Sequence, residues 1–202
     1  MKLTIQMGIC LTILMFWGGS LYGQGTPPNE ALFQKLQSDR TSGEACERFL
    51  KLGKKEADVR KYLTARLPEK IAAGPGDHII VWENEVRLAG LLRIVEAIPS
   101  LIQHIGQVIR QSYSTFSSEE MLRDFPAGAA LGEIGEPAVP ALSSVLESGD
   151  LQKRWVASRA LNMIEATAAT ETLSKHLPSE SDPKLKAYIE DMVQRRRAGL
   201  PH

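Results

Sequence analysis

The sequence is poor in cysteine and has no closely paired histidines. It contains two cysteines, Cys10 and Cys46, and its four histidines are scattered without metal-ligand spacing. Because Cys10 lies in an apolar N-terminal run, removal of that run leaves Cys46 as a single thiol, which excludes an intramolecular disulfide. A lone cysteine among apolar neighbours is most often a small buried residue. We therefore expect no disulfide and no zinc site.

An excess of charge of one sign is also missing, as are the short motifs of common active sites. The 24 basic and 24 acidic residues balance, which gives no bias toward nucleic acid or an anionic membrane. No nucleophile elbow is present, and Gly74-Pro75-Gly76 lacks the Lys-Ser or Lys-Thr that would follow a phosphate-binding loop. These absences predict a protein without catalytic residues, cofactor or metal.

Residues 1–23 differ in composition from the rest of the chain. Lys2 is their one charge, an apolar run follows it, and small residues precede the polar segment that starts at Gln24. This is the pattern of a secretory signal peptide, which we expect to be cut after Gly23, or alternatively after Ser20. The apolar run of about 15 residues is shorter than the ~20 that span a bilayer, so a retained anchor is the less favoured alternative. We therefore expect export to the periplasm or medium, with no membrane association after cleavage.

The mature chain is dominated by helical periodicity, which is clearest around Gly135. Apolar residues at helical spacing precede this glycine, which ends their helix, and Glu136-Pro137 starts another. The first helix repeats after about 30 residues, a period typical of helical repeats. A further copy follows at an offset of about 32. The apolar stripe of the helix before Gly135 consists of Ala127, Ala130, Leu131 and Ile134, and that of the helix after it consists of Val139, Leu142, Val145 and Leu146.

Aspartates mark the starts of two of these repeats. Asp150 and Asp182 each directly precede a predicted helix, where a carboxylate can accept the free N–H groups of the first turn. Each also stands four residues before a basic residue, Arg154 and Lys186, which predicts a supporting ion pair. Two histidines, His104 and His176, fall late in predicted helices, where a cation favours the dipole. The run Arg195-Arg196-Arg197 predicts dipole compensation and a solvated tail, with anion binding as the alternative.

Earlier segments carry weaker helical patterns. Residues 31–36, 42–52 and 56–67 predict three helices, with Pro68 near the end of the third and a loop at residues 72–78. His78 to Trp82 is rich in β-branched residues, but it continues directly into a helical stripe, so we predict a helix. Glu96 to Leu101 resembles the turn at Pro137 to Leu142 and predicts a helix to about Ile109, followed by a polar connection at Ser112 to Ser118.

These motifs resemble HEAT repeats, in particular the phycobilisome-lyase type of HEAT-like repeat. The matching elements are Ala130-Leu131-Gly132, Ile134-Gly135, Glu136-Pro137, Val139-Pro140 and Leu142, together with Asp182-Pro183 and Leu185-Lys186. The resemblance implies an all-α fold, an α-solenoid wound as a right-handed superhelix of about five helix pairs. It also implies a protein-binding scaffold, although a minority of similar proteins attach or detach bilin chromophores or hydroxylate partners.

The chain therefore divides into segments of different character. The expected divisions are a signal peptide at 1–23, an extended lead-in at 24–29, degenerate N-terminal helical repeats at 30–74, a HEAT-like repeat region at 75–197 and a C-terminal tail at 198–202.

The predicted binding surface lies on the helix from Leu151 to Ile164. Trp155, Arg159 and Asn162 are spaced four and then three residues apart, which places them on one helix face. Tryptophan and arginine are enriched at binding hot spots, so we expect this face to bind another protein. The alternative is that Trp155 packs between repeats. Further residues could extend the surface, namely Trp82, Arg87 and Arg123.

The sequence thus predicts an exported, monomeric, non-catalytic scaffold for protein–protein interaction. The alternative is a chromophore or cofactor lyase-like enzyme, or an accessory subunit of an envelope enzyme. An enzyme of that kind needs a general acid or nucleophile in a groove, and the candidates are Cys46, His78 and Tyr113.

Overall fold

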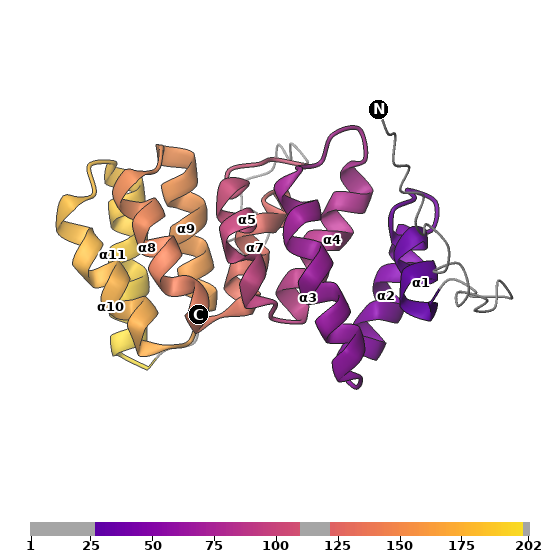
Figure 1. Ribbon diagram of the computed structural model, residues 1–202. Coiled ribbons are helices and arrows are strands. Elements are labelled where there is room, and N and C mark those ends of the chain that lie inside the picture. The colour runs from indigo at the N-terminus through magenta and orange to yellow at the C-terminus, as the bar shows by residue number, and fades with distance from the viewer. Residues whose placement is uncertain (1–26, 110–121, 200–202) are drawn as a thin grey trace, which may run out of the picture.

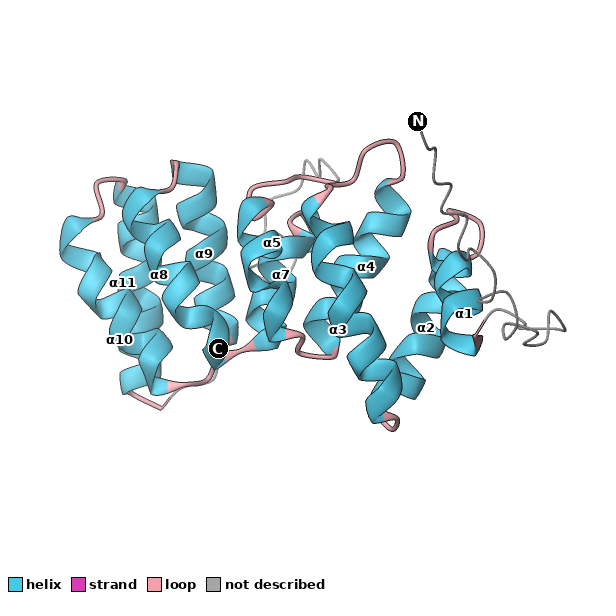
Figure 2. Ribbon diagram, viewed as in Figure 1, coloured by secondary structure: helices cyan, strands magenta, loops and turns pink. Residues whose placement is uncertain are grey.

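The computed structural model describes residues 27–109 and 122–199, and within them the chain is all-α with no strand (Figures 1 and 2). The predicted signal peptide, the connection from Ser112 to Ser118 and Tyr113 lie outside the described residues. None of the described helices is both long enough and apolar enough to cross a membrane.

The helices and short 3₁₀ turns follow one another through brief connections. Their bounds are α1 Pro28–Leu36, α2 Ser42–Gly53, α3 Ala57–Ala72, α4 Ile79–Leu91, η1 Val95–Ala97, α5 Ile98–Gln103, α7 Pro126–Ile134, η2 Glu136–Ala138, α8 Val139–Ser148, α9 Leu151–Met163, α10 Thr167–His176, η3 Leu177–Ser179 and α11 Pro183–Arg197.

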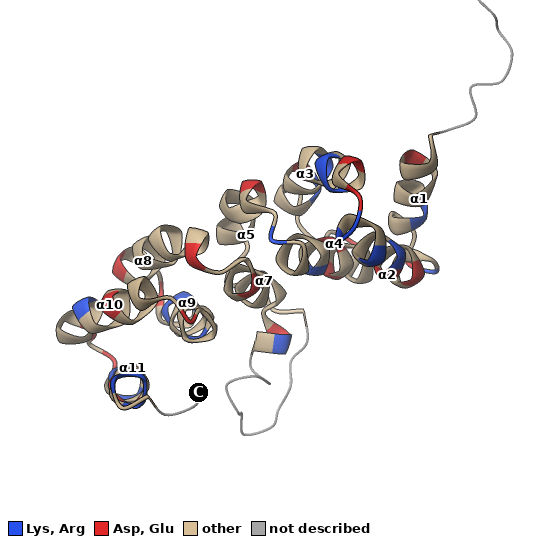
Figure 3. Cartoon of the chain, turned by 90° about the horizontal axis from the view of Figure 1, so that it is seen from below, with Lys and Arg blue, Asp and Glu red and all other residues tan. Residues whose placement is uncertain are grey.

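From α2 onward, the helices alternate between two rows. One row is α2, α4, α7, α9 and α11, each in contact with the next, and the other is α3, α5, α8 and α10. Viewed along the helices in Figure 3, both rows follow the same curve, and the first row lies on its concave side. We call these the inner row and the outer row. Helix α1 packs against α2 and α4 at the N-terminal end.

The turn motif noticed in the sequence recurs as a structural motif. In both copies a 3₁₀ turn, η1 or η2, leads directly into an outer-row helix with a proline at its second position, Pro99 in α5 and Pro140 in α8. Gly135 ends α7 with a φ of 89°, a conformation that residues with a Cβ rarely adopt. The predicted helix at His78 to Trp82 is also confirmed, since α4 begins at Ile79.

Other boundaries differ from the sequence prediction. Helix α5 ends at Gln103 and not near Ile109; turns follow it, and Gly106 is a poor helix former. Helix α3 continues through Pro68 to Ala72, because burial of Ile71 in the core outweighs the hydrogen bond that proline removes. Helix α1 already begins at Pro28, within the expected lead-in.

Both aspartate caps are confirmed, but the ion pairs are not those predicted. Asp150 accepts from the Lys153 N–H at 2.9 Å, and Asp182 accepts from the Leu185 N–H at 2.8 Å. The Asp150 carboxylate pairs with Lys153 and not with Arg154. Arg154 pairs instead with Glu180, a residue distant in the sequence, because the side chain is drawn to a buried carboxylate.

Close contact within the inner row depends on glycine. A Cβ at Gly90 in α4 would lie 2.8 Å from the Cα of Ala130 in α7. On α7, a Cβ at Gly128 or Gly132 would collide with Val156 or Met163 of α9. These three glycines let neighbouring inner-row helices approach at short distance, and together they set the spacing from α4 through α7 to α9.

We predict that Gly90→Ala lowers the free energy of unfolding by about 1–3 kcal/mol, because the new methyl group meets backbone that cannot rotate away. Gly43→Ala is the matched control, since nothing lies within 4 Å of a Cβ there. Its better helix propensity should stabilise the protein by up to about 1 kcal/mol. Urea unfolding measures both variants. Equal stability of the two would show that α4 and α7 can separate without cost.

Candidate functional site

A groove lies between α4 and α7 on the inner row. Its volume is about 280 Å³, and no outer-row helix contributes to its lining, so it opens on the side away from the outer row. Partly buried Leu91 and Ala129 lie on its apolar floor, and charged residues of both signs lie around them. The lining consists of Glu83, Arg87, Gly90, Leu91, Leu122, Arg123, Pro126, Ala129, Ala130 and Glu133.

Arg87, one of the predicted surface residues, lies at this groove. Its side chain is half exposed, lines the groove and donates to Glu47 at 2.7 Å. That hydrogen bond lowers the pKa of the Glu47 carboxyl, and the positive charge of Arg87 adds to the effect. Arg123, the other residue considered as an extension of the surface, lines the same groove from just before α7. The structure thus brings Arg87 and Arg123 to one site.

Trp82 does not belong to this surface. Its side chain is only 1% exposed, its indole N–H donates to the Ile71 carbonyl at 3.1 Å, and its ring packs edge-on against His104. The predicted surface role of Trp82 is therefore wrong, because the contact of α4 with the outer-row helix α3 buries the ring. His104 also packs at this place, with its Nε2 atom 3.1 Å from the Ala72 carbonyl. Its side chain therefore contacts the end of α3, whereas the sequence had predicted only an interaction with the dipole of its own helix.

A second inner-row site is formed by Trp155, Arg159 and Tyr188, which we call the Trp155 cluster. The ring centroids of Trp155 and Tyr188 are 5.2 Å apart. The Arg159 guanidinium carbon lies 5.5 Å from the Trp155 centroid and 4.9 Å from the Tyr188 centroid. Both rings are partly buried and Arg159 is 8% exposed. Trp155 thus packs between α9 and α11 and borders the surface at the same time.

Arg159 has an unusual environment for a cation. The Nε and Nη1 atoms are buried and have no hydrogen-bond partner. Burial lowers the pKa of Arg159 from its ordinary value, and the neighbouring Tyr188 opposes this only in part. Stacking on aromatic rings stabilises the face of a guanidinium, but it leaves the in-plane N–H donors unsatisfied.

Asn162, the third predicted surface residue, lies near the end of α9, where its main-chain carbonyl accepts a hydrogen bond from Arg196 of α11. Arg196 donates to the main-chain carbonyls of Leu161 and Asn162 and to the Thr170 hydroxyl, so it joins α11 to the end of α9. The Asn162 Oδ1 atom is buried without a partner. Arg196 is therefore a partly buried structural residue and not part of a solvated tail, as its sequence position had suggested.

The sequence did not predict Tyr188 or the groove floor. Tyr188 lies on α11, and only the stacking of α11 against α9 brings it to Trp155. Leu91 and Ala129 continue ordinary helical stripes, so no local signal separates them from core residues. A signal for the pair Trp155 and Arg159 did exist, namely their spacing of four residues.

A buried carboxylate, Glu180, joins the start of α9 to the start of α11. Its side chain is 0% exposed and accepts two hydrogen bonds from Arg154 at 3.0 Å, while its carboxylate also accepts from the Asp182 N–H. His176 Nε2 lies 3.1 Å away. Burial by itself would raise the pKa of Glu180, but these hydrogen bonds and the Arg154 charge outweigh it and lower the pKa from 4.5 to about 2.

We predict that this carboxylate contributes to stability in a pH-dependent manner. Because its pKa is lower in the folded state, the contribution is present above about pH 4.5 and is lost as the pH falls toward 2. The shift corresponds to about 3 kcal/mol. Glu180→Gln should lower stability at pH 7 and flatten its pH dependence in this window, as measured by urea unfolding. The exposed Glu171→Gln is the control, and parallel curves for wild type and Glu180→Gln would contradict the prediction.

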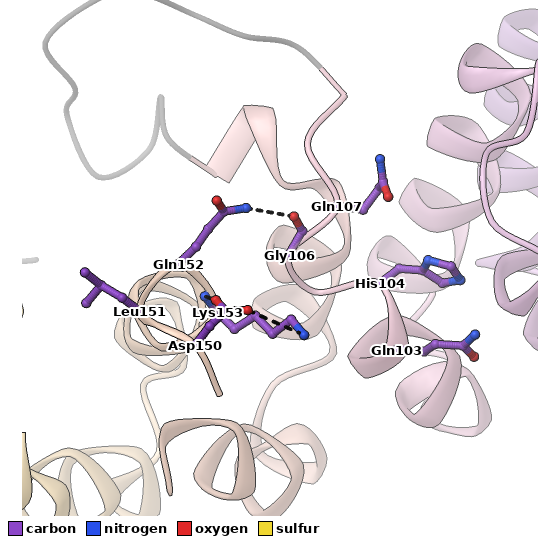
Figure 4. Close-up of a pocket in the computed structure, with 8 residues that line it drawn as sticks. All are labelled: Gln103, His104, Gly106, Gln107, Asp150, Leu151, Gln152 and Lys153. Atoms are coloured by element: carbon purple, nitrogen blue, oxygen red, sulfur yellow. Dashed lines mark hydrogen bonds and ion pairs between the residues drawn. The ribbon is translucent and has the colours of Figure 1, made fainter. Parts of the chain in front are cut away.

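A larger hollow lies elsewhere and has little chemistry to offer (Figure 4). Its volume is about 510 Å³, between the end of α5 and the start of α9. Gln152 donates across it to the Gly106 carbonyl, and Asp150 and Lys153 pair with each other. His104 points away from these residues. The hollow is therefore a polar junction between helix pairs.

Of the three residues considered for an enzyme, Cys46 and His78 lie in the described part of the chain, and Tyr113 lies outside it. Cys46 is 0% exposed, its thiol faces the Asn84 carbonyl, and burial raises its pKa. His78 is exposed and pairs with Asp39 at 3.0 Å. No group of three or more His, Cys, Asp or Glu residues within 27–109 and 122–199 could hold a metal ion.

Comparison with known proteins adds no further identification. The chain matches no known family profile, no curated protein and no solved structure. The functional argument therefore rests on the groove and the Trp155 cluster.

Proposed function

We propose that this protein is an exported α-solenoid of HEAT-like helix pairs, wound as a right-handed superhelix, that binds another protein through its inner row and has no catalysis of its own. The alternation of helices between two rows supports the repeat architecture. The recurrent 3₁₀ turn before α5 and α8 supports it as well. The N-terminal pattern of residues 1–23 supports export.

The groove between α4 and α7 is the observation that carries the proposal. Its floor is apolar and partly exposed, and its rim holds two acidic and two basic side chains, Glu83, Glu133, Arg87 and Arg123. An apolar centre surrounded by a charged rim is the usual anatomy of a protein–protein contact. The partly exposed Trp155 lies on the same inner row and supplies an aromatic residue of the kind found at hot spots.

The lyase-like alternative gains no support from its candidate residues. Cys46 is inaccessible, and His78 is engaged with Asp39. A general acid or nucleophile needs to reach a substrate in a groove, and the α4–α7 groove contains neither residue. We therefore retain the scaffold as the single proposal.

The proposal predicts that a bulky charge in the groove abolishes partner binding. In Ala129→Arg the guanidinium would occupy the apolar floor, and the loss of contact should weaken binding by about tenfold or more. The measurement is affinity capture from envelope or secreted extract with the tagged mature chain. Retained proteins are identified by mass spectrometry, and the affinity of the best candidate is then titrated.

The matched control is Glu171→Arg on α10, an exposed position in the outer row. Circular dichroism and thermal melting should show that both variants keep the helix content of the wild type. If Ala129→Arg captures the same partner with unchanged affinity while folded, the groove is not the binding site.

A further inference from the structure

Arg159 is the one buried cation, in the part of the chain that the structure describes, without an oxygen acceptor. Arg154 has Glu180, and Arg196 has two carbonyls and a hydroxyl. Arg159 is nine-tenths buried, its Nε and Nη1 atoms have no partner, and no Asp or Glu of the described residues pairs with it. A guanidinium stays charged at any physiological pH, so among the described residues this charge has no counter-ion.

An unpaired buried charge is costly to keep for the fold alone. Replacing such a group by an apolar residue of similar size is often neutral or stabilising. The aromatic rings of Trp155 and Tyr188 compensate only the face of the guanidinium. The fold by itself therefore leaves the Nε and Nη1 donors of Arg159 unsatisfied.

We propose that Arg159 in the Trp155 cluster binds a carboxylate of the partner protein. This inference rests on the proposed function, because it assumes that the inner row receives another protein. Arg159 would supply the charge and the in-plane donors, while Trp155 and Tyr188 would flank the bound group and exclude water.

A carboxylate fits better than other anions for two reasons. It is planar, as the guanidinium is, and its oxygens can accept parallel N–H bonds from one edge of that group. It also carries a single negative charge, which balances the one unpaired arginine, since Arg196 already donates to three oxygens. The low local dielectric beside the rings strengthens the interaction.

The arrangement also requires a small movement on binding. The Nε and Nη1 atoms are closed off from solvent in the free protein, and the partly buried rings beside them cover the guanidinium. A carboxylate reaches these donors when one of the rings rotates aside. The indole N–H of Trp155 therefore reports binding directly, whereas that of core Trp82 should not respond.

The first test compares the stability of two arginine variants on α9. Arg159→Leu should leave the melting temperature of the free protein unchanged or raise it, because an unpaired charge is removed. Arg154→Leu strands the buried Glu180 carboxylate and should lower the melting temperature by about 10 °C. If Arg159→Leu is as destabilising as Arg154→Leu, the guanidinium serves the fold, and the proposal is overturned.

The second test titrates short peptides into ¹⁵N-labelled mature protein and follows the Trp155 indole signal. The probes are acetyl-Ala-Glu-Ala-amide, acetyl-Ala-Gln-Ala-amide, acetyl-Ala-Ala-Ala with a free C-terminal carboxylate, and inorganic phosphate. We expect saturable shifts with one or both carboxylate peptides, which also tells whether the partner's carboxylate is a side chain or a chain end. Arg159→Leu should lose the shift, and Arg159→Lys should weaken binding by about tenfold.

Other outcomes contradict the carboxylate site. Equal binding of the glutamine peptide, preferential binding of phosphate, or no saturable shift with any probe would each overturn it. These results leave the capture experiment with Ala129→Arg unaffected, so failure of the carboxylate site and failure of the scaffold function are told apart.

Discussion

The close approach of neighbouring inner-row helices is the constraint on which the rest of the structure depends. Gly90, Gly128 and Gly132 leave no room for a side chain where α4, α7 and α9 meet. The outer-row helices α5 and α8 bury larger residues, including Leu101 and Leu142. Small residues on one side and larger ones on the other bring inner helices closer together than outer ones, and the stack curves as Figure 3 shows.

This curvature positions the candidate site. The groove between α4 and α7 lies beside the close approach of Gly90 to Ala130, and both residues line it together with Ala129. Charged side chains around the floor, including Arg87, form its rim. The small residues that allow α4 and α7 to pack closely therefore also line the apolar groove on the surface of the inner row.

Two arginines on α9 have opposite environments. Arg154 faces the buried Glu180, and this pair, with the Asp182 N–H, joins the starts of α9 and α11. Arg159 lies more than one turn further along, where two aromatic rings flank it and no acid of the described residues pairs with it. A paired buried charge stabilises a particular arrangement, whereas an unpaired one costs free energy until a ligand supplies the opposite charge.

The sequence by itself determined the helical class, the turn at Gly135, the caps at Asp150 and Asp182, and the grouping of Trp155 with Arg159. These features are local, because glycine conformation, capping and i,i+4 spacing act within about one turn of helix. They can therefore be predicted without knowledge of the packing. The helix at Ile79 was predictable for the same reason, since its stripe continues over several turns.

Only the tertiary structure decided which side chains are exposed and which residues distant in the sequence they contact. Trp155 and, as an extension, Trp82 are both candidate surface residues in the sequence, but α3 packs against the helix of Trp82 and its ring is buried, while Trp155 remains partly exposed. Arg154 exchanges its predicted neighbour Asp150 for Glu180, and Tyr188 reaches Trp155 from another helix. Each of these outcomes depends on contacts between segments distant along the chain, and periodicity within one helix carries no information about its neighbours.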